Sequence, residues 1–159
     1  MWAIRIVIIC ILLLIFYQDF KERLVYWFLY PLFGAFAFAL QLFAIPVVSA
    51  LLNVVFNLSF VAILIIVCLL YTKLKLKRTL SEVFGKGDIL FFISAAFAFS
   101  ILSFLVLFVF ALLFSLLIHQ IFKNKQTYNT VPLAGYMALF FCTIYSVGFV
   151  AQTNFLYAL

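Results

Sequence analysis

Long runs of apolar residues constrain this chain more than any other feature of its sequence. A helix needs about 20 apolar residues to cross a lipid bilayer, and this chain of 159 residues is 70% hydrophobic and only 9% charged. Soluble domains carry about 25% charged residues. The composition therefore excludes a soluble fold and predicts an all-α, polytopic membrane protein. We expect a single membrane-embedded domain over residues 1–159, with room for about six spans.

Four apolar runs each predict one span. They cover residues 2–17, 26–45, 47–71 and 131–151, and Pro46 predicts a tight turn between the second and third spans. In lipid, buried amides must find hydrogen-bond partners. We therefore expect the two asparagines of the third span, Asn53 and Asn57, to bond to a neighbouring helix.

Residues 89–122 are apolar but too long for one span. A single helix of this length would measure about 51 Å, whereas the hydrocarbon core is about 30 Å thick. Basic residues lie before it, in residues 73–78, and after it, in residues 123–125. Because basic connections prefer the cytoplasmic side, an even number of crossings should separate them. The sequence therefore predicts two helices that break near residues 100–103, and a six-transmembrane-helix bundle.

The charge distribution indicates how the bundle lies in the membrane. With six spans, nine of the ten basic residues fall on one face, and both termini lie on the other. We expect a multi-pass protein of the cell inner (cytoplasmic) membrane with both termini extracytoplasmic. The exception is Arg5, whose long side chain is expected to snorkel to the headgroups. Because orientation explains the basic residues, no nucleic-acid partner is expected.

Two of the four acidic residues stand out by position. Asp19 and Asp88 abut the cytoplasmic ends of the predicted first and fourth spans, so both carboxylates should lie at one depth. Glu22 and Glu82 lie further into basic loops and are assigned no catalytic role. Two neighbouring carboxylates can share one proton, which leaves one as base for water and the other as acid for a peptide carbonyl. Such a pair needs no cofactor and no metal.

The second aspartate ends a Gly85-Lys86-Gly87-Asp88 motif. Two glycines remove side-chain bulk and allow positive φ, which would let an extended substrate backbone approach the carboxylate. Another interpretation is that the glycines make a turn and Asp88 caps the following helix. Alone, this motif does not decide between an active-site loop and a helix cap.

Together, the two aspartate motifs resemble those of the type IV prepilin peptidases, which belong to the G-x-G-D intramembrane aspartyl proteases. Asp19, Arg23 and Val25 match the first motif in type and order. Gly85, Gly87 and Asp88 match the second, and the segment VPLAGYMAL, residues 131–139, looks like the family's proline-containing start of its last helix. The chain departs from the family at Tyr26 and Trp27, where Pro-Asn is common, and at Leu90, where lysine is frequent.

The resemblance implies an aspartic-type endopeptidase that cuts the basic leader of a prepilin or pseudopilin-like membrane protein at the cytoplasmic face. It implies Asp19 and Asp88 as catalytic residues, and Gly85 and Gly87 as an active-site loop. Bifunctional relatives carry two C-x-x-C pairs, which the sequence lacks, so peptidase without methyltransferase is expected. Two other functions remain open: a small ion- or proton-coupled transporter that uses the aspartates as ion sites, and a non-catalytic scaffold for pilin export.

Overall fold

The structure is a computed structural model that describes residues 2–76, 85–122 and 132–150. All regular secondary structure within these ranges is helical, as the composition predicts. Six α-helices follow one another, and a short π-helical turn, Thr72–Leu76, continues the third. The helices are α1 (Trp2–Glu22), α2 (Leu29–Ala44), α3 (Val47–Tyr71), α5 (Lys86–Ala95), α6 (Ile101–Phe122) and α7 (Leu133–Val150).

Three of these helices are long and apolar enough to cross a membrane. They are α1, the continuous helix Val47–Leu74, and α6, whereas α2, α5 and α7 are shorter. Helix α5 has ten residues, or about 15 Å at 1.5 Å per residue. By itself it reaches through about half of a hydrocarbon core. The six helices are all-α and compatible with a helical membrane bundle, and the helix that carries Asp88 is the shortest of them.

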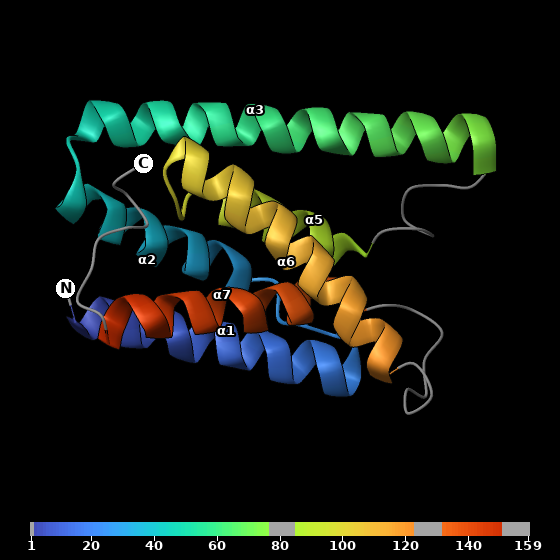
Figure 1. Cartoon of the computed structure of the whole chain (residues 1–159), viewed down its shortest axis with the longest axis horizontal. Coiled ribbons are helices and arrows are strands. Elements are labelled where there is room, and N and C mark those ends of the chain that lie inside the picture. Colours follow the sequence, from blue (N-terminus) through green and yellow to red (C-terminus); the bar gives the residue numbers. More distant parts are fainter. Residues whose placement is uncertain (1, 77–84, 123–131, 151–159) are drawn as a thin grey trace.

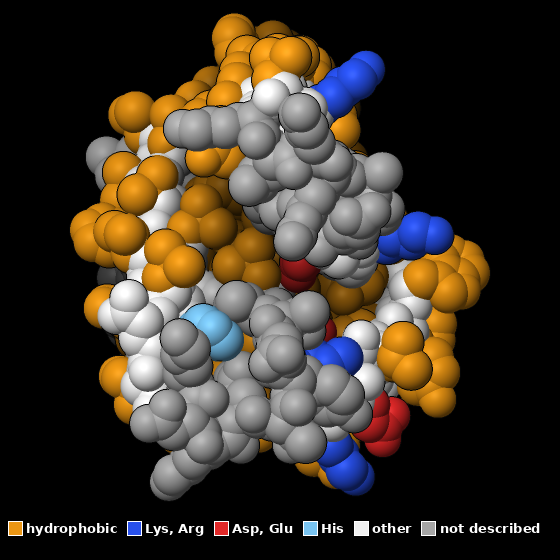
Figure 2. All heavy atoms as spheres, turned by 90° about the vertical axis from the view of Figure 1, so that its right-hand side faces the viewer, with side chains coloured by type: hydrophobic (Ala, Val, Ile, Leu, Met, Phe, Trp, Pro, Cys, Tyr) orange, Lys and Arg blue, Asp and Glu red, His pale blue; other side chains and the backbone are white. Residues whose placement is uncertain are grey.

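The helices are arranged so that both chain ends of the described bundle meet on one side. In Figure 1, α1 begins and α7 ends at the left, whereas α1, α3 and α6 end and α5 and α7 begin toward the right. Seen from that right-hand side, Lys, Arg, Asp and Glu side chains gather on the end face, and hydrophobic side chains cover the flanks (Figure 2). Half or more of the side chains of Leu113 in α6 and Ile63 in α3 is exposed. Such a surface suits contact with lipid chains.

The break between α5 and α6 confirms that residues 89–122 form two helices. It lies slightly earlier than predicted, since α5 ends at Ala95 and α6 begins at Ile101. The Asn57 side chain of α3 donates hydrogen bonds to the carbonyl oxygens of Ala96 and Phe99, at 3.0 and 2.9 Å. This amide satisfies backbone acceptors that the break exposes. Asn53 makes no side-chain hydrogen bond with any residue that the structure describes.

The position of Arg5 corrects the expectation that its side chain snorkels to the headgroups. Arg5 is only 8% exposed, and its Nη1 donates a 2.7 Å hydrogen bond to the carbonyl oxygen of Gly148 in α7. The last carbonyls of a helix lack partners within the helix and attract cations. Arg5 therefore joins the start of α1 to the end of α7, and the neighbouring rings of Trp2 and Phe149 pack edge to face at 5.2 Å.

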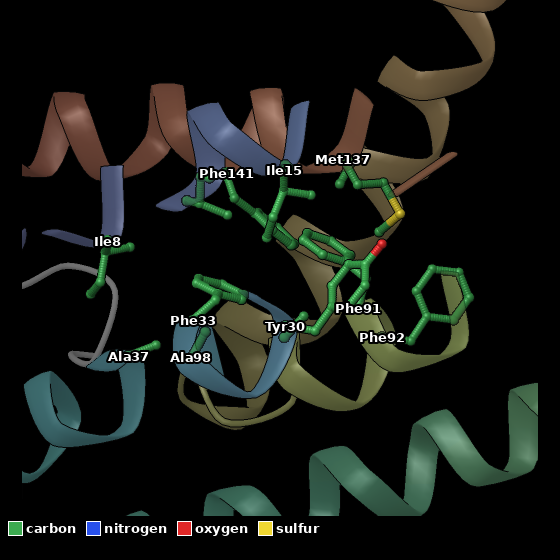
Figure 3. Close-up of a cluster of buried hydrophobic side chains, with 14 of the residues drawn as sticks. Ile8, Ile15, Tyr30, Phe33, Ala37, Phe91, Phe92, Ala98, Met137 and Phe141 are labelled. Carbon is green, nitrogen blue, oxygen red and sulfur yellow. The ribbon is translucent and has the colours of Figure 1, made fainter. Parts of the chain in front are cut away.

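The core between the helices is rich in aromatic rings. Phe91 of α5 stacks on Phe33 of α2 and on Phe141 of α7, each at 5.8 Å between ring centroids. Figure 3 shows these rings with Tyr30 and with Ile8 and other aliphatic side chains of α1. Offset and edge-on ring pairs add about 0.5–1.5 kcal/mol each beyond the area they bury. The core thus fixes α5 between α2 and α7, which positions Asp88.

Candidate active site

Asp19 lies near the C-terminal end of α1, against the first turn of α7. Its Oδ2 accepts a 2.6 Å hydrogen bond from the backbone N–H of Gly135. A Cβ atom at Gly135 would lie 2.9 Å from both Cβ and Oδ2 of Asp19, closer than real Cβ atoms approach. Glycine at position 135 therefore allows α1 and α7 to meet closely enough for this bond. Hydropathy places the end of the first span at residue 17, but α1 continues to Glu22 and includes Asp19.

Asp88 lies in the first turn of α5 and bonds in two directions. Its Oδ2 accepts from the backbone N–H of Gly85 at 3.2 Å, which caps the start of α5. Its Oδ1 accepts from the backbone N–H of Ala134 in α7 at 2.9 Å. One carboxylate oxygen of Asp88 therefore caps α5, and the other accepts a hydrogen bond from α7.

The first turn of α7 brings the two aspartates together. The donors to Asp88 and Asp19 are the N–H groups of Ala134 and Gly135, which are neighbours in the chain. The first N–H groups of a helix have no partner within it and form the positive end of its dipole, so they favour carboxylates. The two carboxylates also interact electrostatically with each other. The structure thus places both sequence-predicted catalytic residues in one site.

The two motif glycines lie close to other side chains of the site. Gly85 has a φ of −64°, and none of the glycines that the structure describes has a positive φ. Positive φ is therefore not what these positions require. A Cβ at Gly87 would lie 2.6 Å from the Tyr30 hydroxyl oxygen, and a Cβ at Gly85 would lie 3.2 Å from Oδ2 of Asp88. Position 87 requires glycine because the Tyr30 hydroxyl occupies the space that a Cβ atom would take.

Arg23 follows α1 directly and is the cation of the site. It has a φ of 57°, in the left-handed region that non-glycine residues rarely adopt. Its guanidinium interacts attractively with both Asp19 and Asp88, and its Nε and Nη1 atoms are shielded from solvent. A left-handed residue costs of order 1–3 kcal/mol and persists where its surroundings enforce it. The residue with this backbone conformation, Arg23, is also the one that places a positive charge beside the two carboxylates.

The site lies at the end of the bundle and is partly accessible. Asp19, Asp88 and Arg23 are all half-buried, whereas Lys86 next to them is exposed. Among the described residues, no three His, Cys, Asp or Glu side chains are grouped so that they could hold a metal ion. The arrangement offers two carboxylates, a nearby cation and fixed backbone donors, which suits proton transfer to and from a bound molecule. Glu82 and residues 123–125 lie outside the described residues.

Comparison with other proteins adds no further constraint. No family model, curated protein or solved structure matches the chain.

Sequence reasoning missed three residues of this site. Ala134 and Gly135 act through backbone N–H groups, which any residue except proline carries, so their side chains give no signal. Both residues, together with Pro132, were recognised only as part of the start of the last helix. Tyr30 lies in the apolar run of α2 and was not distinguished from core residues. Its part in the site follows only from the packing of α2 against α5.

Proposed function

We propose that this protein is an intramembrane aspartyl endopeptidase in which Asp19 and Asp88 form a two-carboxylate dyad. One observation carries the proposal: adjacent N–H groups of α7, at Ala134 and Gly135, bind the carboxylates of two residues that lie 69 positions apart in the chain (88 − 19). A structural helix cap requires one such carboxylate. Two carboxylates on one turn, near enough to interact, are the arrangement that shared-proton chemistry requires.

In the proposed reaction the dyad holds a single proton. The ionised carboxylate takes a proton from water, which attacks the peptide carbonyl carbon, while the protonated carboxyl donates to the carbonyl oxygen. Collapse of the tetrahedral intermediate breaks the C–N bond, and the departing amine takes a proton from the dyad. Fixed backbone donors hold each carboxylate in place, so little reorganisation is needed during the reaction.

We propose a prepilin or pseudopilin-like precursor as the substrate, cut on the cytoplasmic side. The motif resemblance supports this class, and so does the position of the site at a bundle end. A substrate helix could lie against the hydrophobic flank while its unwound leader junction reaches Asp19 and Asp88. Irregular backbone is tolerated there because water can solvate it.

The test is cleavage of a candidate precursor with a basic leader, co-expressed with wild type, Asp19→Asn or Asp88→Asn and followed by immunoblot. We expect each asparagine variant to lose at least about 100-fold in cleavage rate, because an amide cannot exchange the required proton. Glu22→Gln is the matched control, since Glu22 is an exposed carboxylate at the same end of α1. Membrane insertion of each variant is checked by fractionation.

The outcomes separate the proposed function from the alternatives. Cleavage by wild type and Glu22→Gln alone supports the dyad. Equal cleavage by either asparagine variant contradicts it. Ion flux that depends on Asp19 and Asp88, without any proteolysis, would favour a transporter. Binding of precursors that is unchanged in both asparagine variants, again without proteolysis, would favour a scaffold.

A further inference from the structure

Tyr30 is a buried polar residue that neither motif includes. It lies in the first turn of α2 and is only 2% exposed. Its ring packs edge-on against Phe91 of α5, with 6.3 Å between centroids, and Figure 3 shows it among the buried side chains of the core. The ring is therefore explained by packing. The hydroxyl group is not, since an apolar ring would pack in the same way.

The hydroxyl of Tyr30 lies against the active-site loop. Its oxygen is 2.6 Å from the position that a Cβ of Gly87 would take, one residue before Asp88. It is also close enough to both Asp19 and Asp88 to interact with them electrostatically. The phenol therefore lies beside the dyad, although it comes from a helix that contributes no other group to the site.

The Tyr30 hydroxyl differs in its hydrogen bonding from the backbone donors that the structure describes in the site. The N–H groups of Gly85, Ala134 and Gly135 already bind carboxylate oxygens. Tyr30 makes no hydrogen bond with any residue in the described part of the chain. Among the described residues, the Tyr30 hydroxyl oxygen is also not one of the fully buried polar atoms that lack a partner. The hydroxyl is therefore open to a molecule bound beside the dyad.

We propose that Tyr30 is a third catalytic residue, whose O–H donates a hydrogen bond to the oxygen anion formed when water adds to the scissile carbonyl. The inference rests on the proposed peptidase function. Water forms the new C–O bond and gives its proton to the ionised carboxylate, and the carbonyl electron pair moves to oxygen. That oxygen accepts from the protonated carboxyl and from Tyr30. The phenol keeps its own proton throughout, so no additional acid or base is needed.

The magnitude of the effect follows from comparable donors. Removing one donor to such an oxygen lowers kcat by about 100- to 1,000-fold in enzymes where it has been tested. Here the protonated carboxyl supplies a second donor to the same oxygen. We therefore expect a loss in kcat below that range, about 10- to 100-fold. The loss should appear in kcat and leave KM within about twofold, because the bond forms only in the transition state.

The first experiment measures precursor cleavage by purified wild type, Tyr30→Phe and Tyr26→Phe in detergent or vesicles. Tyr30→Phe removes only the hydroxyl and keeps the ring on Phe91. Tyr26 is the matched control, since it is 64% exposed near the same end of the molecule. A fall in kcat for Tyr30→Phe alone supports the inference. Wild-type kcat in Tyr30→Phe would overturn it.

A second experiment separates chemistry from space filling. Gly87→Ala should clash with the Tyr30 hydroxyl, whereas in Tyr30→Phe the nearest remaining ring atom, Cζ, would be 3.4 Å from the new Cβ. The double variant should therefore regain the thermal stability that Gly87→Ala loses. Its kcat should stay as low as that of Tyr30→Phe. Recovery of wild-type kcat in the double variant would show that the hydroxyl acts only by its size, and would overturn the inference.

Failure of the inference and failure of the proposed function give different results. If wild type cleaves, the asparagine variants do not, and Tyr30→Phe matches wild type, then only the role of Tyr30 is wrong. If well-inserted wild type cleaves no precursor with a basic leader, the peptidase proposal fails and the role of Tyr30 fails with it.

Discussion

Gly135 donates its backbone N–H to the Asp19 carboxylate over 2.6 Å, although the two residues lie 116 positions apart in the chain. The bond joins the last turns of α1 to the first turn of α7. It requires that position 135 carry no side chain, because a Cβ there would overlap Asp19. One glycine thus links the packing of two helices to the geometry of the proposed dyad.

Gly135→Ala should lower the cleavage rate strongly while the protein still folds and inserts into the membrane. The added methyl group must push α1 away from α7 or turn Asp19, and overpacking of this kind typically costs 1–3 kcal/mol. We expect cleavage to fall at least about tenfold, while the protein still inserts. Val147→Ala, on the exposed face of α7, is the control. Wild-type cleavage by Gly135→Ala would show that the Gly135–Asp19 contact is dispensable.

Arg23→Gln should change the pH dependence of cleavage. The guanidinium attracts both carboxylates, and a nearby cation favours the ionised form of an acid. Without it, the ionised carboxylate that activates water forms only at higher pH. The acidic limb of the pH–rate profile should therefore move to higher pH. Arg23→Lys keeps the charge and should move it less, so equal profiles for all three proteins would contradict the prediction.

Arg5→Leu should destabilise the bundle but leave the chemistry intact. The substitution removes a hydrogen bond from a charged group to Gly148, worth about 1.5–3 kcal/mol. For a chain of this size, that corresponds to a fall in Tm of roughly 3–12 °C. Thermal unfolding in detergent measures the change. Since Arg5 lies at the opposite end of α1 from Asp19, kcat at low temperature should be unchanged, and a loss of kcat would argue against separate roles for the two ends.

Asn57→Leu should weaken the junction between α5 and α6. The amide donates to two carbonyl oxygens at the break, and side-chain hydrogen bonds inside membranes average about 0.6 kcal/mol, with a maximum near 1.7. We expect a lower Tm than in wild type. Asn53→Leu is a matched control one helical turn away, and it should have little effect. Similar losses in both variants would mean that the hydrogen bonds of Asn57 are not what stabilises the junction.

Hydropathy predicted most of the helices because lipid demands long apolar segments. The third span was predicted at residues 47–71, which are the bounds of α3, and Pro46 lies in the turn before it. The end of α1 was missed because four of the five residues 18–22 are polar or charged, yet they continue the helix. Polarity marks where a helix leaves the lipid, which is not always where the helix ends.

Only the two carboxylates of the candidate site were predicted as catalytic groups. Asp19 and Asp88 were chosen for their chemistry, and charge placed them at one end of the bundle. Their partners come from backbone groups of α7 and from a tyrosine within an apolar run. Arg5 was misplaced because sequence shows that a buried cation needs a partner but not that a helix terminus supplies one.

The way in which α7 holds the carboxylates also bears on which sequence changes the protein can tolerate. A backbone N–H survives every substitution except one to proline, so the side chain at Ala134 can vary as far as the space around it allows without removing the donor to Asp88. The sequence here must specify two features of the backbone: a helix that begins after Pro132, and a residue without a side chain at position 135. Two distant homologues of this protein could share the same carboxylate geometry and have few identical residues in this turn.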